Sequence, residues 1–278
     1  MKFKLINGWA VRLAGIFLFV LGWSYFYTLP PLLTAEKERA AKVPSIKIES
    51  LSKQAGRAPW RVCYLGSNSF HHHALDIIRK LKNPPVLVLI DAHSDASPAS
   101  EKLNCGNWVK YAQGENAIKK TIWLGGALGI SMECVKWFSF ESLSSGKMYP
   151  FPARGCRAYF KTDKRALCRF EYAKKEKNDS IGAFFGEPGV SVSWYNWREA
   201  FELGALKKII EDNDIYISLD LDVLKKEVAP TVWGNGLMTM AELKEMLDYL
   251  KANFKITGMD ICGPKEQGME VLKYAERF

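Results

Sequence analysis

Two short apolar runs, each followed by alternating ionisable residues, constrain the fold of this 278-residue chain more than any other feature. The first run, Val86–Ile90, leads into Asp91-Ala92-His93-Ser94-Asp95. The second run, Tyr216–Leu219, leads into Asp220-Leu221-Asp222-Val223. Short runs that are wholly or mostly apolar are typical of strands buried in a parallel sheet. Ligands of such sheets gather at the carboxyl ends of the strands, so both segments are predicted to lie at one edge.

The ionisable residues of these segments are predicted to bind metal. Because side chains alternate along a strand, Asp91, His93 and Asp95 are expected on one side if the strand continues past its apolar run, and Asp220 and Asp222 likewise. Carboxylates and imidazoles crowded at strand ends are costly to desolvate without cations. This ligand set favours Mn²⁺ over structural zinc, and two cations roughly 3.5–4 Å apart hold and ionise a water molecule. Alternatively, a single buried aspartate such as Asp220 caps a helix or accepts loop hydrogen bonds.

All four histidines stand where a metal ligand would be useful. His93 lies in the first ionisable segment, and the other three form the run His71-His72-His73 at the start of a predicted helix. A solvated helix start is the alternative for this triplet, so only one of its members is expected to be a ligand.

These motifs resemble those of the arginase and agmatinase (ureohydrolase) superfamily, and most closely an uncharacterised arginase-like branch. The shared pattern is a histidine at a helix start, then D-A-H-S-D, then S-L-D-L-D-V-L followed by Ala229-Pro230. Gly258-Met259-Asp260 is similar to the last core strand of the family, and the resemblance spans roughly residues 61 to 264. It implies a three-layer α/β/α fold and a site for two cations, most simply Mn²⁺.

The resemblance also implies a role for each ligand. His71 matches the first histidine of the family, with His72 as the second choice. Asp91 and Asp220 would bridge the two cations. His71 and Asp95 would complete the position of one cation, and His93 and Asp222 would complete the position of the other.

The chain departs from the family pattern at three places. The family's Gly-Gly-Asp before the first histidine is Asn68-Ser69-Phe70, which changes the support of the ligand. The family's active-site histidine falls near Cys105, so Cys105, a carboxylate such as Asp95, or water must move the proton. The glutamate that binds guanidinium falls near Gly263. Arginine and agmatine are therefore not expected as substrates.

The N-terminal segment is predicted to be a membrane anchor. Residues 9–27 are nearly all apolar, long enough to span a bilayer, with Trp and Tyr at the edges. A cleavable signal peptide is the alternative. The flanking cations are nearly balanced, and the domain is expected on the extracytoplasmic side of a single span. The predicted organisation is an anchor over residues 1–33, a linker over 34–58 and one α/β domain over 59–278.

The alternation of predicted strands and helices favours a doubly wound, mostly parallel sheet. Helices are predicted over 72–81, 197–211 and 239–253, the last with a capping box of Thr239 and Glu242. The predicted strands are Arg61–Leu65, Val86–Ile90, Thr121–Leu124, Val190–Trp194, Ile215–Leu219 and Ile256–Met259.

Residues 138–188 break this alternation and are interpreted as an insertion, with a hairpin around Tyr159-Phe160 and Arg169–Tyr172, able to cover the metal site. The insertion is basic and holds part of the net charge of +9, but no nucleic-acid-binding motif is present. Anionic lipid or a solvated face is expected instead. Cys156 and Cys168 are spaced for a disulfide in an oxidising compartment, or are free. The basic residues are Arg154, Arg157, Lys161, Lys164, Arg165 and Arg169.

Two classes of function stay open on this pattern. The first is a membrane-anchored hydrolase that uses two metal ions to cleave a C–N bond of a small molecule, an amide, amidine or ureide. The second is a catalytically inactive, arginase-like metal-binding or structural protein. The intact ligand set favours the first class, and the missing histidine and glutamate favour the second. The oligomeric state is not predicted.

Overall fold

A computed structural model of the protein describes most of the predicted α/β domain. The predicted anchor and linker, residues 1–58, lie outside the described residues, as does Cys168 of the predicted disulfide. No helix among the residues that the structure describes is long and apolar enough to cross a membrane. The described residues are 61–97, 102–127, 142–143, 145–154, 156–160, 173–175 and 190–277.

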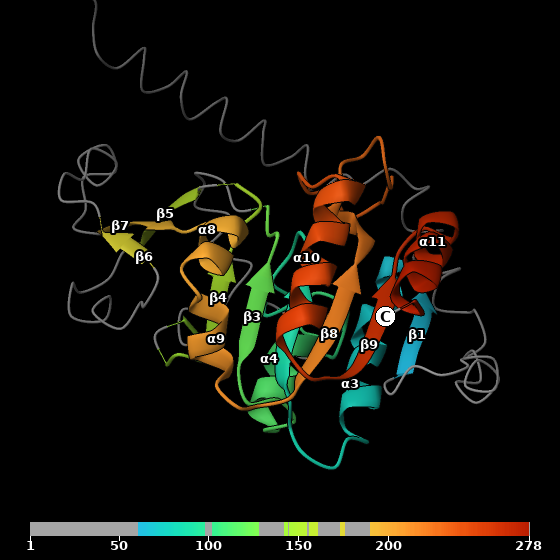
Figure 1. Ribbon diagram of the computed structural model, residues 1–278, viewed down its shortest axis with the longest axis horizontal. Helices are drawn as coiled ribbons and strands as arrows, with labels where there is room; N and C mark the ends of the chain where they lie inside the picture. Colours follow the sequence, from blue (N-terminus) through green and yellow to red (C-terminus); the bar gives the residue numbers. More distant parts are fainter. Residues whose placement is uncertain are drawn as a thin grey trace, which may run out of the picture. The chain divides into compact units, whose positions relative to one another are not determined.

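The centre of the domain is a six-stranded sheet in the order β1-β9-β8-β2-β3-β4 (Figure 1). Every neighbouring pair in it is parallel, which confirms the predicted parallel sheet. Its middle strands are built from apolar runs whose residues are all buried, as expected for strands covered on both faces. The strands are β1 (Arg61–Gly66), β2 (Val86–Ile90), β3 (Thr121–Leu124), β4 (Met148–Phe151), β8 (Ile215–Asp220) and β9 (Ile256–Cys262).

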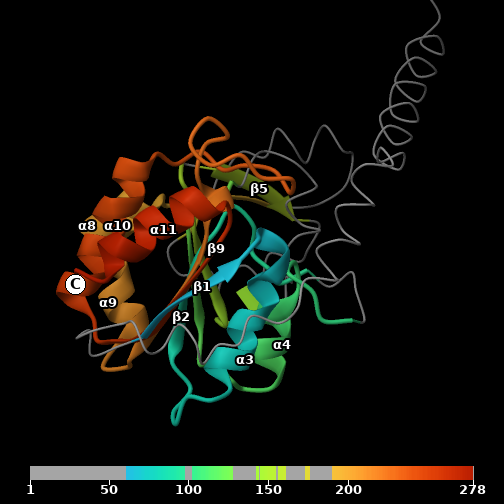
Figure 2. The same ribbon diagram turned by 90° about the vertical axis from the view of Figure 1, so that its right-hand side faces the viewer.

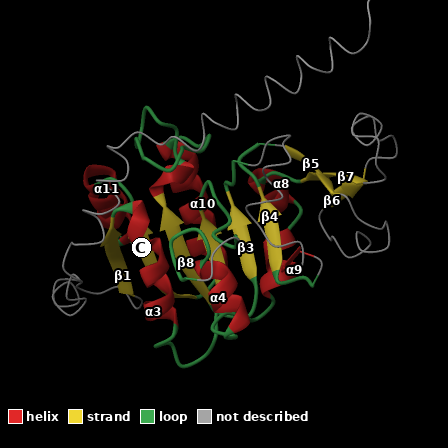
Figure 3. Ribbon diagram, turned by 180° about the vertical axis from the view of Figure 1, so that it is seen from behind, coloured by secondary structure: helices red, strands yellow, loops and turns green. Residues whose placement is uncertain are grey.

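Helices cover both faces of this sheet and make the three-layer α/β/α arrangement (Figures 2 and 3). Alternate residues of β2 supply the two cores: Val88 packs under one helical layer and Leu89 under the other. The first layer comprises α8 (Trp197–Glu202), α9 (Ala205–Ile210), α10 (Met240–Asn253) and α11 (Lys265–Ala275). The second comprises the 3-10 helix η2 (Asn68–His73), α3 (Ala74–Ile78) and α4 (Trp108–Gly114).

The strand order reverses between β2 and β8, which lie side by side in the middle of the sheet. Their register pairs Val86 with Ile215 and Ile90 with Leu219, so their carboxyl ends stand at the same level. The chain leaves β2 toward β3 on one side and leaves β8 toward β9 on the other. A crevice for ligands forms at such a switch point, because the connections diverge there. Both ionisable segments begin at this place.

The predicted helices are present, with local differences. The capping box of Thr239 and Glu242 at the start of α10 is confirmed. The single helix predicted over 197–211 is wrong, because the chain turns at Gly204 with a φ of 63° and separates α8 from α9. The helix predicted from His72 begins earlier as η2 and ends at Ile78.

A separate three-stranded antiparallel sheet corrects one other prediction and leaves a second untested. The predicted strand Val190–Trp194 is present as β7, but it pairs antiparallel with β5 (Cys156–Phe160) and β6 (Ala173–Lys175) instead of joining the parallel sheet. Tyr159-Phe160 of the expected hairpin lie in β5, which pairs with β7. The second arm of that hairpin lies outside the described residues.

The sequence analysis did not predict β4, α4 or α11. β4 lies within residues 138–188, which were interpreted as an insertion, and pairs with β3 in the parallel sheet. β4 contains Pro150, and α4 and α11 each contain a glycine, which weaken strand and helix signals in the sequence. Burial against the sheet compensates for these weak local preferences.

Candidate metal centre

All six predicted ligands lie together at the carboxyl ends of the parallel strands. His71 stands on η2, immediately after β1. Three ligands, Asp91, His93 and Asp95, follow β2, and Asp220 is the last residue of β8. The sixth, Asp222, lies in the 3-10 turn η4 (Leu221–Val223). Five of the six are buried, and only His93 is partly exposed, with 29% of its side chain accessible.

Loop geometry, and not the period of the strands, brings these side chains together. β2 ends at Ile90, so the strand does not continue through Asp95 and the condition for the expected alternation is not met. Asp95 has a φ of 49°, in the left-handed region that aspartate tolerates better than most residues. The backbone NH of His93 donates to Oδ1 of Asp91 at 2.6 Å, and the NH of Asp222 donates to Oδ1 of Asp220 at 2.8 Å. The side chains of Asp91 and Asp220 therefore each accept a backbone NH two residues further on, and these local turns place the next ligand beside them.

The imidazole of His71 faces three carboxylates through one nitrogen. Its Nδ1 lies 2.8 Å from Oδ2 of Asp95, 3.2 Å from Oδ2 of Asp91 and 3.6 Å from Oδ2 of Asp220. Its Nε2 lies 2.8 Å from the hydroxyl of Ser218, which donates to Oδ1 of Asp260 at 2.9 Å. Because that hydroxyl already donates, it accepts from Nε2–H of His71. The lone pair of a neutral His71 is thereby left on Nδ1, the arrangement of a metal-binding histidine.

A second imidazole meets the other side of the same carboxylate cluster. Nδ1 of His93 lies 2.8 Å from Oδ2 of Asp222 and 3.6 Å from Oδ1 of Asp91. The second oxygen of Asp222 accepts the backbone NH of Ala92 at 3.1 Å. Asp91 thus presents one oxygen to each histidine. Two groups of potential ligands, one with His71 and Asp95 and one with His93 and Asp222, share Asp91.

Neighbouring polar groups orient these ligands. The indole NH of Trp108 donates to Oδ2 of Asp95 at 2.7 Å. The amide of Asn68 donates to Oδ1 of Asp220, and the hydroxyl of Ser218 connects His71 with Asp260. Groups that hold metal ligands in this way set both ligand orientation and affinity. Sequence reasoning noticed Asn68 only as a departure from a motif and missed the others, although Ser218 and Asp220 share a face of β8.

The electrostatics of the cluster indicate that it is built for added positive charge. Burial, followed by the charge of Asp222, raises the pKa of Asp220 to about 7, and the same two causes raise the pKa of Asp91 as well. Burial lowers the pKa of His93, but its hydrogen bonds to Asp222 and Asp91 outweigh this and raise the pKa to about 12. Bound protons therefore compensate the carboxylates when no cation does so.

Two buried atoms of the centre have no hydrogen-bond partner among the described residues, Nδ1 of His71 and Oδ2 of Asp91. They face each other across 3.2 Å. An imidazole lone pair and a carboxylate oxygen left unsatisfied at the same place are costly in a protein interior. A cation bound by both would satisfy them, so the residues present fit a metal ion.

The other two histidines of the triplet lie away from the cluster. Nδ1 of His73 pairs with Oδ2 of Asp76 at 3.1 Å, one turn further along the chain. The ring of His72 lies 4.4 Å from the ring of His73, and burial followed by the charge of His73 lowers its pKa. Of the three histidines, the structure brings His71 into the centre.

Cys105 and Gly263, the two departures with most bearing on chemistry, are both close to the centre. Burial, followed by the charge of Asp95, raises the pKa of the Cys105 thiol to about 12, so this thiol stays neutral near pH 7. A neutral thiol is a poor nucleophile or base. Gly263 has a φ of 132°, and an added Cβ would lie 2.6 Å from Cβ of Leu221. The backbone itself thus disfavours a glutamate at position 263.

Fold and centre together define an α/β protein with a buried carboxylate and histidine cluster at the switch point of a parallel sheet. The motifs that form this cluster are those through which the chain resembles arginases and agmatinases. No family model matches the chain. A Thermotoga maritima protein described as uncharacterized is 23% identical over 202 residues, 73% of this chain and 57% of that protein.

Similar solved structures bear names from the same superfamily. A hypothetical agmatinase from Burkholderia thailandensis is 15% identical, with a TM-score of 0.45, over 75% of this chain and 52% of that one. The proclavaminate amidino hydrolase of Streptomyces clavuligerus is 16% identical, with a TM-score of 0.45, over 78% of this chain and 63% of that one. The agmatine ureohydrolase of Thermoplasma volcanium is 14% identical, with a TM-score of 0.47, over 82% of this chain and 65% of that one. The chain spans less than two thirds of each protein, and substrate and metal must be inferred from its own residues.

Proposed function

We propose that this chain is a hydrolase of a C–N bond that works with two divalent cations. The observation that carries the proposal is the position of Asp91, whose two oxygens face two different histidines, 3.2 Å from His71 and 3.6 Å from His93. A carboxylate placed between two ligand groups is suited to hold two cations close together. A pair of cations, when bound, lowers the pKa of water and polarises the bond that is cleaved.

The side chains divide naturally between the two proposed cation positions. His71 and Asp95 would hold one cation, His93 and Asp222 the other, and Asp91 would contribute to both. Asp220 was expected to bridge as well. Its Oδ2 faces His71, whereas its Oδ1 already accepts from Asn68 and from the backbone of Asp222. These contacts favour Asp220 as a ligand on the His71 side, with Asp91 as the principal bridge.

Protein groups beside the centre must move the proton, because the family's histidine is absent. Oδ2 of Asp95 is held between the indole NH of Trp108 and Nδ1 of His71, so Asp95 is fixed as a ligand and is poorly placed to swing as a proton carrier. The neutral thiol of Cys105 is suited to donate a hydrogen bond to a leaving group. We propose Cys105 or water for the proton transfer and Asp95 for positioning.

The proposed substrate lacks a guanidinium group. Recognition of that cation needs a facing carboxylate, and Gly263 provides no side chain where the family has one. A loop with exposed Val232 and Trp233 approaches the centre, since a Cβ added to Gly234 would lie 3.9 Å from Nε2 of His93. An apolar loop and no free carboxylate at position 263 favour a neutral amide or ureide, or an amidine with an apolar substituent.

A substrate panel tests this proposal. The purified full chain, loaded with Mn²⁺, is assayed for ammonia, amine or urea release from ureides, amidines and N-acyl amines, with arginine and agmatine included. Hydrolysis of a panel member is expected, with loss of activity in Asp91→Asn and retention in Asp214→Asn at the opposite end of β8. Release of urea from arginine that depends on Asp91 would contradict the proposed substrate class.

The alternative function is a metal-binding protein without catalysis. It is favoured by the absent histidine and by the raised pKa of Cys105, which together leave no base of ordinary strength at that place. Two cations bound per chain, with no hydrolysis of any panel member, would support this alternative.

We further propose that residues 9–27 anchor the domain in a membrane, with the domain on the extracytoplasmic side. The length and apolar character of this segment support the proposal, and the segment lies outside the described residues. A spanning helix is not held by surface charge, so the full chain should stay in the membrane during alkaline carbonate extraction. Release of the intact chain would contradict the anchor. Release of a chain shortened near Ala35 would indicate a cleaved signal peptide.

A further inference from the structure

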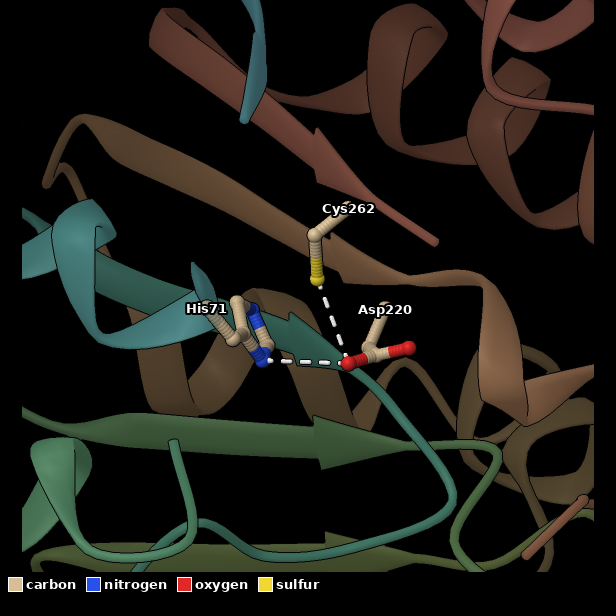
Figure 4. Close-up of side chains that lie close together, drawn as sticks. All are labelled: His71, Asp220 and Cys262. Carbon is tan, nitrogen blue, oxygen red and sulfur yellow. Dashed lines mark hydrogen bonds and ion pairs between the residues drawn. The ribbon is translucent and has the colours of Figure 1, made fainter. Parts of the chain in front are cut away.

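The side chain of Cys262 points into the proposed metal centre from the end of β9. Cys262 is completely buried and pairs in register with Asp220 on β8. Its Sγ donates to Oδ2 of Asp220 at 3.2 Å, as Figure 4 shows. The backbone after it is fixed, because Gly263 donates to the carbonyl of Gly66 and its own carbonyl accepts from Tyr64, both at 2.7 Å. The thiol is therefore held in place and is not a mobile surface group.

The atoms opposite this thiol form a group of potential ligands. A ring nitrogen of His71, a carboxylate oxygen of Asp220 and Sγ of Cys262 all lie within 4.8 Å of one another (Figure 4). Nδ1 of His71 is buried and has no hydrogen-bond partner among the described residues, while its Nε2 is occupied by Ser218. The unsatisfied nitrogen lies 3.6 Å from Oδ2 of Asp220, the same oxygen to which the thiol donates, so nitrogen and sulfur meet at one carboxylate oxygen, which is a place for a cation.

We propose that Cys262 is a thiolate ligand of the cation at the His71 position, and that this position selects a borderline metal such as Zn²⁺, Fe²⁺ or Co²⁺ over Mn²⁺. Thiolate ligands favour such metals, whereas carboxylate and imidazole ligands alone suit Mn²⁺. Binding exchanges the thiol proton, which is released to solvent, for a metal–sulfur bond. This inference rests on the proposed two-metal centre and concerns only which metal occupies one half of it.

The other half of the centre offers a contrast within the same chain. Its ligand group consists of Asp91, His93 and Asp222, and no sulfur belongs to it among the described residues. A hard cation such as Mn²⁺ suits that group. The two positions should therefore fill with different metals when both kinds are supplied, which a centre made only of oxygen and nitrogen ligands has no reason to do.

Cobalt titration of the full chain tests the proposal without relying on activity. A Co²⁺ ion bound to thiolate absorbs in the near ultraviolet through sulfur-to-metal charge transfer. The wild-type protein, with its metal removed by a chelator, is expected to show this band at one equivalent of Co²⁺. The matched control Cys63→Ser, on the adjacent strand β1, should show the same band. The band should be missing in Cys262→Ser and should persist in His93→Ala, which alters the other position.

Metal competition provides the second readout. With equal Zn²⁺ and Mn²⁺, the wild-type chain should retain one zinc, and the preference for zinc should fall at least about tenfold in Cys262→Ser, comparable to losses seen for weaker supporting groups. Two Co²⁺ bound to the wild-type chain without the band would overturn the thiolate ligand and leave the proposed hydrolase intact. A band that persists in Cys262→Ser would overturn it too. Failure to bind any cation would overturn both proposals.

Discussion

Asp220→Asn should stabilise the metal-free protein, although it removes a proposed metal ligand. The pKa of Asp220 is raised from 3.8 to about 7, chiefly because the carboxyl is buried and secondly because of the charge of Asp222. An acid whose pKa is raised by folding destabilises the folded state once it is ionised. The cost is absent below pH 3.8 and complete above about pH 7.

The magnitude follows from that difference in pKa. At about 1.4 kcal/mol for each pH unit, a rise from 3.8 to about 7 corresponds to roughly 4 kcal/mol at pH 8. Asp222 and His71 share the interaction, so the expected gain for the asparagine variant is about 2–4 kcal/mol in the free energy of unfolding. The amide keeps the oxygen that accepts from Asn68 and from the backbone of Asp222.

Urea denaturation of the full chain, followed by tryptophan fluorescence, measures this effect because Trp108, Trp123 and Trp197 are buried. With a chelator at pH 8 the variant should be more stable than the wild type, and at pH 4 the two should agree. With divalent cations the difference between the two proteins should narrow. A free cation concentration of 100 Kd stabilises by about 2.7 kcal/mol for each site, and the variant lacks part of that gain.

Asp214→Asn is the matched control, since Asp214 precedes β8, pairs with Lys255 at 3.0 Å and lies outside the centre. It should change stability little, because such a surface pair contributes less than about 1 kcal/mol. A metal-free Asp220→Asn protein that is less stable than the wild type at pH 8 would refute the reasoning. The native hydrogen bonds of the carboxylate would then outweigh its burial, and the centre would not need a cation.

Three further predictions concern the surroundings of the centre. Gly263→Glu should lower the free energy of unfolding by about 2 kcal/mol or more in urea denaturation. The added Cβ would lie 2.6 Å from Cβ of Leu221, and the φ of 132° strains any residue with a side chain. The variant should not release urea from arginine. Retained stability would show that the turn relaxes easily. Trp108→Phe should weaken metal affinity about 10–100-fold in a cation titration, because Asp95 loses its indole donor, and unchanged affinity would contradict a positioning role. Glu242→Gln should be less stable than the wild type by about 1–2 kcal/mol near pH 7. Burial raises the pKa of Glu242, but hydrogen bonds from Thr239, Arg154 and Arg198 outweigh burial and lower the pKa from 4.5 to about 2. The stabilisation by the Glu242 carboxylate is therefore complete above pH 4.5 and is lost as the pH falls toward 2. If the difference in stability between Glu242→Gln and the wild type does not narrow between pH 4.5 and 2, the loss comes from packing and not from the charge of Glu242.

Local sequence determined the elements that form the middle of the sheet. The runs Val86–Ile90 and Thr121–Leu124 are strands with the predicted bounds, because short, mostly apolar runs of this kind are typical of strands covered on both faces. The capping box at Thr239 is likewise a local property of four residues. The candidate ligands were also named from the sequence: five stand in the two motifs at the strand ends, whereas His71 came from the family resemblance, with His72 as the second choice.

Tertiary structure alone decided how those ionisable residues meet. The expected alternation along a strand did not place them, because Asp95 adopts a left-handed conformation and Asp222 lies in a 3-10 turn, and both depend on neighbouring loops. Elements with weak local signals, such as β4 and α11, formed through burial against the sheet. Cys262 is the clearest case. It is 42 residues from Asp220 in the chain, and only the pairing of β8 with β9 brings the thiol beside that carboxylate. Motifs report local chemistry, whereas contacts between distant residues exist only once the sheet has assembled.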